Sequence, residues 1–438
     1  MNRLQVPERL DNTVKEDTRR GYTQIENMTN NKIKVLDLFA GCGGMSYGFE
    51  QAGLDVVLAN EIWEDAQETY KLNHKNTRMV EGDITKRDIK DKVIELAKEK
   101  EVNVVVGGPP CQAYSNAGLR NPDDPRGKLF EDYVEVVKNV RPTFFVMENV
   151  KGILTMKQFK EDITSTQKKE IEKYHNLLNR KNQLLKKRKQ HKNNSEKFLF
   201  TDKHRTELKK TKDRLKILKK EVDSLRVSVP NKIKTRMENI GYKVKYKTLN
   251  SANYGVPQKR ERVIFIGVLG DIDISYPKTT HRNPKQTRLT NMKKPRWKNV
   301  KETIDDLKSK KSEEINAHLF TNHSPSFIDK IKNTDIGEGV YSSYSDSYYR
   351  NPPDEPSRTV KENHGGVFVH YEEDRVMTPR ELARLQSFPD TFSFKGSKSS
   401  ILKQIGNAVP PELGKAIAEK IKEIYDRRRY RKATKTNS

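Results

Sequence analysis

The most reactive candidate in the sequence is Cys111, which lies in GGPPCQAYSNAG after the short apolar run VNVVVGG. Two prolines precede the thiol; they cannot continue a helix, and they stiffen the chain. Structural cysteines usually lie inside apolar runs, whereas Cys111 has polar and turn-forming neighbours. The pattern predicts a nucleophilic thiol on a rigid loop at the end of a strand. Cys42, in a glycine-rich turn, is predicted to be a small packing residue.

Charged residues lie beside two further apolar runs. Glu148 follows TFFVM, and a carboxylate at the end of a buried strand needs a partner or a task. Gln258, Arg260 and Arg262 surround the start of the strand predicted in VPQKRERVIFIG. Alternate residues of a strand point the same way, so Arg260 and Arg262 are predicted to share a face. Guanidinium groups suit phosphates and base carbonyls, which makes these arginines candidates for binding nucleic acid. The alternative is that they form salt bridges on a surface strand and bind no ligand.

A glycine turn in DLFAGCGGMSYGFEQAG suggests a nucleotide-like ligand. Gly41 and Gly43 allow a sharp turn after a strand, before a helix whose N-terminus can hold an anionic group. Glu61 ends the next predicted strand, where a carboxylate can accept from both ribose hydroxyls. Asp83, in EGDI at the end of the third strand, can accept from an adenine amino group. Trp63 and Phe39 could sandwich the adenosine or be core aromatics.

A nicotinamide dinucleotide is the alternative ligand. Its fingerprint has a third glycine where this chain has Ser46, which disfavours it. Two acidic residues at successive strand ends also argue against a turn that serves packing alone.

The elements that would position these residues alternate between strand and helix. Apolar strands are predicted in KIKVLDLFA, LDVVLANE, VNVVVGG and TFFVMENV, with amphipathic helices between them. This alternation predicts the α/β class with a doubly wound parallel sheet.

Residues 155–228 interrupt the alternation. They hold 23 Lys and Arg against 10 Asp and Glu, a net +13 of the chain's +26. One apolar heptad position contains Leu208, Leu215 and Val222, and another contains Leu218 and Leu225. An earlier helix is indicated by Ile171, Tyr174, Leu178 and Leu185, with HKNNSEK as the link. The pattern predicts an inserted helical hairpin, an antiparallel coiled coil.

The composition limits the remaining possibilities. A net charge of +26 favours a polyanionic partner such as nucleic acid. Two cysteines form no disulfide framework, no Cys and His cluster has zinc-ligand spacing, and no metal site is expected. Without a signal-like start or a membrane-length apolar run, the protein is expected in the cytoplasm and away from membranes.

Taken together, these motifs resemble the DNA (cytosine-5)-methyltransferase family of bacterial restriction-modification systems. The matching segments occur in the family's order: DLFAGCGG, NEIW, EGDI, GGPPCQAYS, ENVKGIL, GVPQKRERVIFIG, TPRELARLQSFPD and QIGNAVPP. The resemblance implies a Rossmann-like S-adenosylmethionine-dependent domain and a smaller, irregular target-recognition domain. The chain departs from the family in having Tyr114 where a phenylalanine is usual, and in its insert at 155–228.

Composition and periodicity set three boundaries: a polar loose arm or short helix over 1–31, the insert over 155–228 and a basic tail over 427–438 that is expected to be disordered. Between them the resemblance implies catalytic segments over 32–154, 229–270 and 399–426 and a target-recognition domain over 271–398.

Site roles follow from the same resemblance. Cys111 would be the nucleophile, Glu148 would bind the cytosine N3 and amino group, and Arg262 would hold O2 with Arg260 on a nearby phosphate. The implied cofactor pocket contains Phe39, Gly41, Gly43, Glu61, Trp63, Asp83, Ile84, Pro109, Leu129 and Asn407. The implied DNA contacts are Gln112, Ser115, Gln258 and Thr359, the last in SRTV.

The expected reaction is methyl transfer from S-adenosyl-L-methionine to carbon 5 of a flipped-out cytosine in a specific duplex sequence, protecting host DNA from a cognate restriction endonuclease. A tRNA cytosine-5 methyltransferase is the main alternative; an inactive DNA-binding regulator and a dehydrogenase are less favoured. A monomer is expected, unless the insert dimerises the enzyme. The insert could otherwise contact phosphates or be a solvated decoration.

Overall fold

The computed structural model describes residues 32–110, 129–160, 162–193, 200–270, 272–285, 293–341, 348–362 and 367–436. Contacts divide the chain into two compact units. The main unit comprises 1–110, 128–151 and 237–438, and the hairpin unit comprises 111–127 and 152–236. The predicted N-terminal arm and the nucleophile loop at 111–128 lie outside the described residues.

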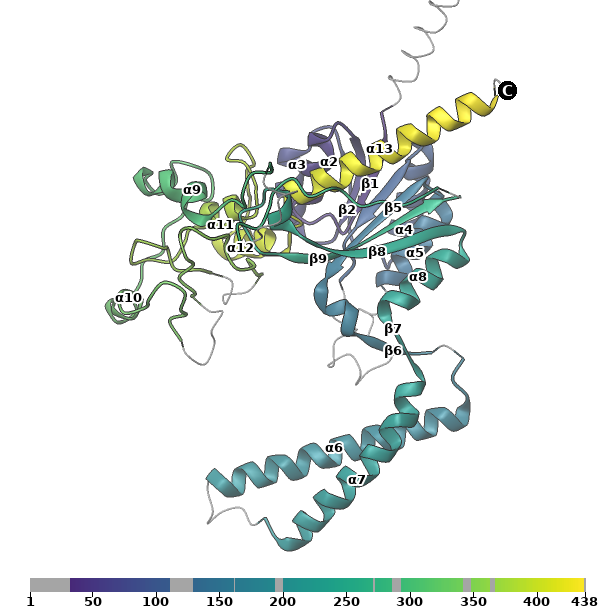
Figure 1. Ribbon diagram of the computed structural model, residues 1–438, viewed down its shortest axis with the longest axis vertical. Helices are drawn as coiled ribbons and strands as arrows, with labels where there is room; N and C mark the ends of the chain where they lie inside the picture. The colour runs from purple at the N-terminus through teal and green to yellow at the C-terminus, as the bar shows by residue number, and fades with distance from the viewer. Residues whose placement is uncertain are drawn as a thin grey trace, which may run out of the picture. The chain divides into compact units, whose positions relative to one another are not determined.

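The main unit is built on a seven-stranded sheet with the order β3-β2-β1-β4-β5-β9-β8 (Figure 1). Neighbouring strands from β1 to β5 are parallel, and β9 runs antiparallel to both β5 and β8. The α/β class is therefore confirmed. The strands are β1 (Lys34–Leu38), β2 (Asp55–Glu61), β3 (Arg78–Glu81), β4 (Val104–Gly107), β5 (Phe144–Val150), β8 (Tyr242–Asn250) and β9 (Glu261–Leu269).

Helices cover this sheet because successive strand side chains point to opposite faces and both sets are apolar. These helices are α2 (Gly44–Gln51), α3 (Glu64–Asn73), α4 (Arg87–Glu99), α5 (Leu129–Val140) and α13 (Pro411–Thr436), with the 3-10 helix η5 (Ser251–Tyr254) between β8 and β9. Helix α8 (Val229–Asn239) precedes β8, and the division between the two units falls within it. The predicted disordered tail is wrong, because α13 continues to Thr436.

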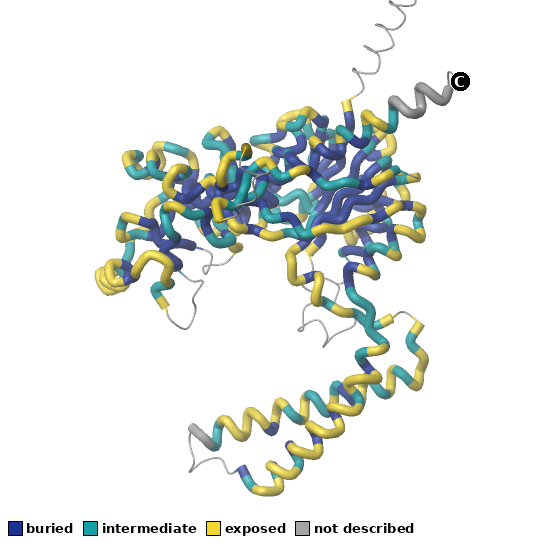
Figure 2. Tube along the Cα trace, viewed as in Figure 1, coloured by how far each residue is buried: buried dark blue, intermediate teal, exposed yellow. Residues whose placement is uncertain are grey.

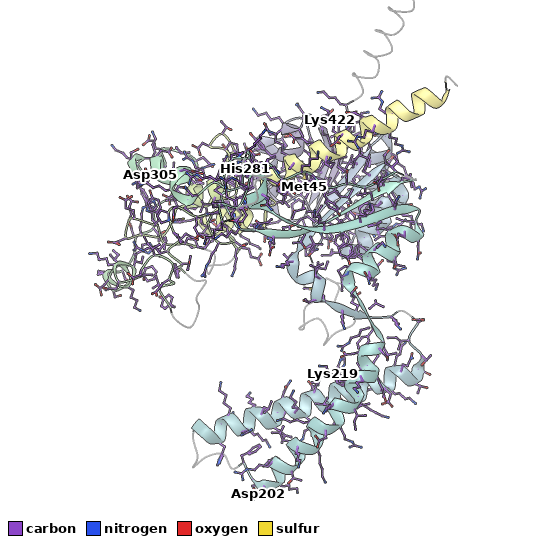
Figure 3. The ribbon with its side chains drawn as sticks, viewed as in Figure 1. Met45, Asp202, Lys219, His281, Asp305 and Lys422 are labelled. Carbon is purple, nitrogen blue, oxygen red and sulfur yellow. The ribbon has the colours of Figure 1, made fainter. Side chains whose placement is uncertain are left out.

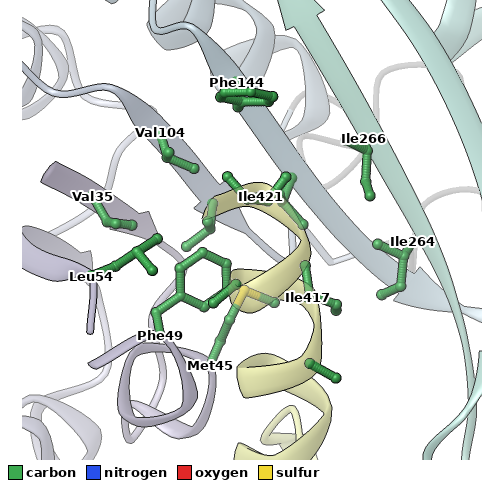
Figure 4. Packing of buried hydrophobic residues seen from close by; sticks show 14 of the residues in the cluster. Val35, Met45, Phe49, Leu54, Val104, Phe144, Ile264, Ile266, Ile417 and Ile421 are labelled. Carbon is green, nitrogen blue, oxygen red and sulfur yellow. The ribbon is translucent and has the colours of Figure 1, made fainter. Parts of the chain in front are cut away.

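One face of the sheet packs on α2 and α13. Figure 4 shows Met45 and Phe49 of α2 and Ile417 of α13 against strand residues such as Val35 and Phe144. Glycine permits this close packing: a Cβ on Gly48 would lie 2.3 Å from the Pro411 carbonyl oxygen. The other face receives α5, whose Tyr133 hydroxyl donates to the carbonyls of Val105 and Val146.

The region from about 271 to 398 is less regular, as predicted from its composition. Its short helices are α9 (Val300–Ile304), η7 (Asp305–Ser309), α10 (Pro325–Lys332) and α11 (Pro379–Leu385), followed by α12 (Lys398–Asn407). A second apolar cluster includes Val300, Phe368, Phe388 and Ile405, and it also takes in Cys42 from the glycine turn. This shared core leaves the boundary of a separate recognition domain a prediction.

The hairpin unit contains η4 (Lys151–Thr155), a small sheet of β6 (Lys157–Phe159) and β7 (Arg226–Ser228), and two long helices that lie between these strands in the chain. These are α6 (Ser165–Asn193) and α7 (Asp202–Ser224), and Figure 2 shows both largely exposed. The predicted helical hairpin is confirmed. Of the helices in the described part of the chain, none is long and apolar enough to cross a membrane.

The seam of the hairpin differs from prediction at one position. Leu208, Leu215 and Val222 are buried as predicted, but Leu185 is 36% exposed while its neighbour Leu184 is fully buried. Phe200 explains the shift: it lies just before α7 and packs with Leu184 and Leu208. Because Phe200 lies outside the heptad pattern, the residue buried at this end of the seam is Leu184 and not Leu185.

Candidate active site

The polar residues singled out by the sequence gather at one edge of the sheet. The glycine turn follows β1, Glu61 ends β2, Asp83 follows β3, and Glu148 lies near the end of β5. These strands are parallel, so their carboxyl ends share an edge. Between β1 and β4 the strand order reverses, and open α/β sheets bind ligands in the crevice at such a point.

The glycine turn holds three residues in left-handed conformations: Phe39 has φ 56°, Gly41 φ 55° and Gly43 φ 94°. Such a φ is uncommon outside glycine, and strain of this kind gathers at ligand sites. A Cβ on Gly43 would lie 2.2 Å from His74 Nε2, so packing excludes it. A Cβ on Gly41 would have no neighbour within 4 Å. Gly41 therefore leaves open space that a ligand can fill.

Glu61 fixes the shape of this turn. Its Oε2 accepts from the Gly41 amide at 2.7 Å, and its Oε1 accepts from the Ile62 and Trp63 amides at 2.9 Å. A carboxylate has about four acceptor positions, so three are already used. One further hydroxyl can be accepted without rearrangement, whereas a grip on both ribose hydroxyls would displace an amide.

The other predicted cofactor residues surround the same edge. Asp83 Oδ1 accepts from the Thr85 amide at 2.9 Å, and none of the described residues donates to its second oxygen; Ile84 beside it is buried. Lys403 of α12 lies 4.5 Å from the centre of the Trp63 ring, on one of its faces. Open space at Gly41 and spare acceptors on Glu61 and Asp83 fit a nucleoside with hydroxyl and amino donors.

Leu129 and Asn407 lie at helix ends. Leu129 is the half-buried first residue of α5, and Asn407 is the exposed last residue of α12. Just after Asn407, the Val409 carbonyl would lie 2.4 Å from a Cβ on Gly44, so this segment packs against the start of α2. No described contact joins either side chain to the glycine turn, and their cofactor roles stay predictions.

The nucleophile loop is described only up to its base. Cys111, Gln112 and Ser115 lie outside the described residues. At the base, the Asn149 side-chain amide donates to the buried Pro109 carbonyl at 3.0 Å. Asn149 was not among the residues predicted for the site, although its place beside Glu148 in a buried strand indicates a polar side chain with a structural partner. It anchors the chain two residues before Cys111.

Glu148 and Arg262 form an ion pair at this base. The register pairs Val150 with Arg262, which makes Glu148 a diagonal neighbour of Arg262 on the same face. Arg262 Nε lies 2.8 Å from Glu148 Oε1, and the two side chains are only 12% and 13% exposed. Burial lowers the pKa of Arg262, and the Glu148 charge opposes that shift. A Cβ on Gly108 would lie 3.1 Å from Glu148 Oε2, so the carboxylate borders the loop.

Arg260 does not share this face, which corrects the prediction. Strand β9 begins at Glu261, so strand alternation does not extend to Arg260. Its side chain is 1% exposed and donates to the carbonyls of Val360, Gly406 and Ala408 at 2.8 to 3.0 Å. Desolvation by burial lowers its pKa. These bonds make Arg260 a link between distant segments instead of a phosphate ligand.

Gln258 is likewise buried, contrary to its predicted contact with DNA. Its amide donates to the Leu385 carbonyl and to Gln386, while its oxygen accepts from the Val360 amide. Thr359 is half-buried, and its hydroxyl donates to the Lys259 carbonyl at 2.9 Å. Together these bonds tie the segment at 357–360 to the start of β9, and a DNA contact by Thr359 stays a prediction.

Asp37 was not singled out in the sequence, although a carboxylate within the strand KVLDL is unusual. Burial raises its pKa to about 7, and it accepts from the Ser46 hydroxyl at 2.6 Å. Burial also raises the pKa of Cys42 to about 12. Cys42 is 2% exposed within an apolar cluster, which agrees with its predicted packing role.

Comparison with known proteins decides the family. The C-5 cytosine-specific DNA methylase model matches residues 33–179 and 218–423. The chain belongs to this family. Type II methyltransferase M1.HphI of Haemophilus parahaemolyticus is 33% identical to this methylase, over 89% of this chain and 86% of its own. Type II methyltransferase M.DdeI of Desulfomicrobium norvegicum is 30% identical, over 90% and 89%.

Solved structures agree on the fold of the methylase. The S. pombe Dnmt2 methyltransferase has a TM-score of 0.53 at 15% identity and covers 90% of this chain and 99% of its own. The Entamoeba histolytica methyltransferase EhMeth has a TM-score of 0.51 at 14% identity, over 91% and 99%.

Proposed function

We propose that this methylase transfers a methyl group from S-adenosyl-L-methionine to carbon 5 of a cytosine in duplex DNA, through a covalent bond between Cys111 and the base. The observation that carries the proposal is the ion pair of Glu148 and Arg262, held at 2.8 Å beside Gly108 at the base of the Cys111 loop. Cytosine N3 and O2 are both bonded to C2 and face the same edge of the base, so a neighbouring pair of an acidic and a cationic group matches them.

The cofactor fits the strand-end residues described above. Phe39, Gly41 and Gly43 would shape its cradle, Glu61 and Asp83 would accept from the nucleoside, and Trp63 would flank it. When bound, S-adenosyl-L-methionine supplies an electrophilic methyl group.

The base itself requires activation, because carbon 5 of cytosine is a poor nucleophile. The Cys111 thiolate adds to carbon 6, and the electron pair of the 5,6 double bond makes carbon 5 nucleophilic. Glu148 holds a proton at N3, and Arg262 donates to O2, so the charge that develops on the ring is stabilised. After carbon 5 gains the methyl group, it loses its proton to a base, and the bond to Cys111 breaks.

Access to carbon 6 requires the base to leave the stack, since the thiolate attacks perpendicular to the ring. The Gln112 to Arg126 segment contains glycine, asparagine and proline, a composition that suits a lid over the flipped base. Gln112 and Ser115 within it, and Thr359, are proposed DNA contacts.

Duplex DNA is favoured over tRNA because the matching family model is that of a C-5 cytosine-specific DNA methylase and both named relatives are type II methyltransferases. The same names support protection of host DNA against a cognate restriction endonuclease. The enzyme is further proposed to act as a monomer in the cytoplasm.

The decisive experiment compares acceptors with radiolabelled cofactor. Label should enter duplex DNA and not tRNA, and bisulfite sequencing of the product should find the modified cytosines in one sequence context. Label in tRNA alone would establish the alternative. In duplexes that carry 5-fluorocytosine at that site, a covalent complex through Cys111 should accumulate only with cofactor present.

A further inference from the structure

The hairpin unit holds charge that the proposed reaction does not use. The match to the methylase family leaves out 180–217, the distal part of the hairpin. The insert at 155–228 nevertheless carries a net +13, half of the chain's charge. The arrangement of this charge on α7 indicates what it binds.

Four exposed lysines form a row along one side of α7. Lys209, Lys212, Lys216 and Lys219 follow one another at spacings of three and four, which places them on one face of a helix. We call this row the lysine stripe; Figure 3 labels Lys219 at one end of it. At 1.5 Å per residue, the stripe is about 15 Å long. It lies beside the seam residues Leu208 and Leu215 in the helical repeat.

The stripe lacks counter-charges of its own. In the described part of the hairpin, none of its four lysines pairs with a carboxylate. By contrast, Arg180 of α6 grips Glu207 of α7 with bonds of 2.6 and 3.0 Å. Like charges three and four residues apart destabilise a helix, so the stripe is costly unless an external anion neutralises it.

The stripe leads into a cationic cavity near the distal end of the hairpin. The cavity has a volume of about 380 Å³, and Arg188 from α6 lines it together with Arg205, Lys209 and Lys212 from α7. Phe200 and Leu208 form its apolar wall. Arg205 is bound to Asp202 at 2.8 Å, whereas Arg188 has no carboxylate partner among the described residues. Convergent cations of this kind suit a phosphate group.

The apolar seam offers little for self-association. Leu208, Leu215 and Val222 are already buried inside the hairpin. Among the described side chains of α6 and α7, the exposed large apolar ones are Leu185 and Ile217, at 36% and 67%. Two isolated apolar residues make a poor dimer interface, so the observations favour a polyanion.

We propose that the lysine stripe and the cavity bind the phosphate backbone of duplex DNA without reading its sequence. The proposal rests on the proposed function, which makes duplex DNA the substrate. Lysine is a point charge that positions a backbone and carries no base code. A stripe of about 15 Å runs alongside roughly four base pairs at 3.4 Å each.

The test compares two full-length variants that each lose four exposed lysines. The stripe variant is K209Q/K212Q/K216Q/K219Q, and the control is K168Q/K169Q/K203Q/K210Q, whose lysines lie off the stripe. Glutamine and lysine have similar helix propensity, so α6 and α7 should persist, as circular dichroism can verify. Affinity for a 30-base-pair duplex is measured between 50 and 200 mM salt.

Each phosphate contact contributes about 0.9 to the slope of log affinity against log salt. The slope of the stripe variant should be shallower than that of the wild type by about 3 to 4. Between 50 and 200 mM salt, the wild type should therefore lose about a hundredfold more affinity than the stripe variant does. The control should lose less than 1. Bisulfite sequencing should find the same methylated site in the wild type and both variants.

The proposal would be overturned if the stripe variant and the control had equal slopes. It would also be overturned if the slope of the stripe variant equalled that of the wild type. Weakened binding of single-stranded RNA with unchanged duplex binding would overturn it in favour of an RNA partner. If the wild type transfers no methyl group to DNA, the proposed function fails, while the slopes still report independently on the stripe.

Discussion

The strand-end site and the hairpin use charge in opposite ways. Arg260 is buried and the Arg262 side chain is only 12% exposed, and each is held by fixed partners. On α7, the lysine stripe is exposed and lacks carboxylate partners among the described residues. Removing a buried charge from water is costly, so its hydrogen bonds must be geometrically specific. Exposed charges instead act nearly independently and favour any polyanion.

This difference separates chemistry from affinity within one chain. Substitutions at the strand ends should abolish turnover or unfold the main unit, whereas substitutions in the hairpin should change binding or local stability alone.

The largest effect should follow Cys111→Ser. A hydroxyl is a far weaker nucleophile than a thiolate, so kcat should fall at least about a thousandfold while DNA and cofactor still bind. Cys42→Ala is the matched control, because burial raises the pKa of Cys42 to about 12 and keeps it a thiol. It should keep its turnover. Retention of a tenth of the wild-type kcat by Cys111→Ser would exclude the covalent route.

Glu148→Gln should lower kcat by about a hundredfold or more, because the proton at N3 loses its charged partner. Glu261→Gln is the control: Glu261 starts the same strand as Arg262 and pairs with the exposed Lys151 at 2.7 Å. Single-turnover rates at saturating DNA separate chemistry from binding. Equal rates for the two variants would remove Glu148 from the catalytic step.

Sequence reasoning succeeded where a local pattern carries the information. Strand periodicity and the position of polar residues at strand ends placed Glu61, Asp83 and Glu148 on one edge of the sheet. It failed for Arg260, whose partners Val360 and Gly406 lie 100 and 146 residues away. No local spacing encodes such contacts, and a buried arginine and a DNA-binding arginine look alike in sequence.

Arg260→Met tests that correction. The carbonyls of Val360, Gly406 and Ala408 would lose their donor, so the free energy of unfolding should fall by about 3 kcal/mol. Urea denaturation measures the loss. The folded fraction should bind DNA with an unchanged salt slope; a shallower slope at normal stability would restore the predicted phosphate contact.

Asp37→Asn should change how the stability of the main unit depends on pH. Burial raises the pKa of Asp37 to about 7 in the folded protein, from 3.8. Between these values the folded protein keeps a proton that the unfolded chain has lost. This group therefore lowers the free energy of unfolding as pH rises from about 4 to 7, and the cost is complete above pH 7.

The asparagine variant lacks this titration, so its stability relative to the wild type should rise by about 4 kcal/mol between pH 4 and 8, at about 1.4 kcal/mol per pKa unit. Urea denaturation of both proteins across that range gives the difference. Asp273→Asn is a control of opposite sign, since the hydrogen bond from Lys245 lowers the pKa of Asp273. A pH-independent difference for Asp37→Asn would mean that Asp37 stays ionised when buried.

The smallest effect on the enzyme should come from Leu184→Ala, which is confined to the hairpin. Leu184 is fully buried with Phe200 and Leu208, so its truncation should cost about 2 kcal/mol of local stability. Leu185→Ala, at a side chain 36% exposed, should cost less than about 0.5 kcal/mol. A regular heptad seam predicts the reverse order, because it places Leu185 and not Leu184 inside.

Hydrogen exchange of α6 and α7 amides reports this local stability, while the thermal midpoint of methyl transfer should stay unchanged in both variants. Leu184→Ala could instead lower the thermal midpoint of methyl transfer as strongly as it lowers the protection of the α6 amides. The hairpin and the main unit would then unfold together, and a substitution in the hairpin would not be confined to binding or local stability.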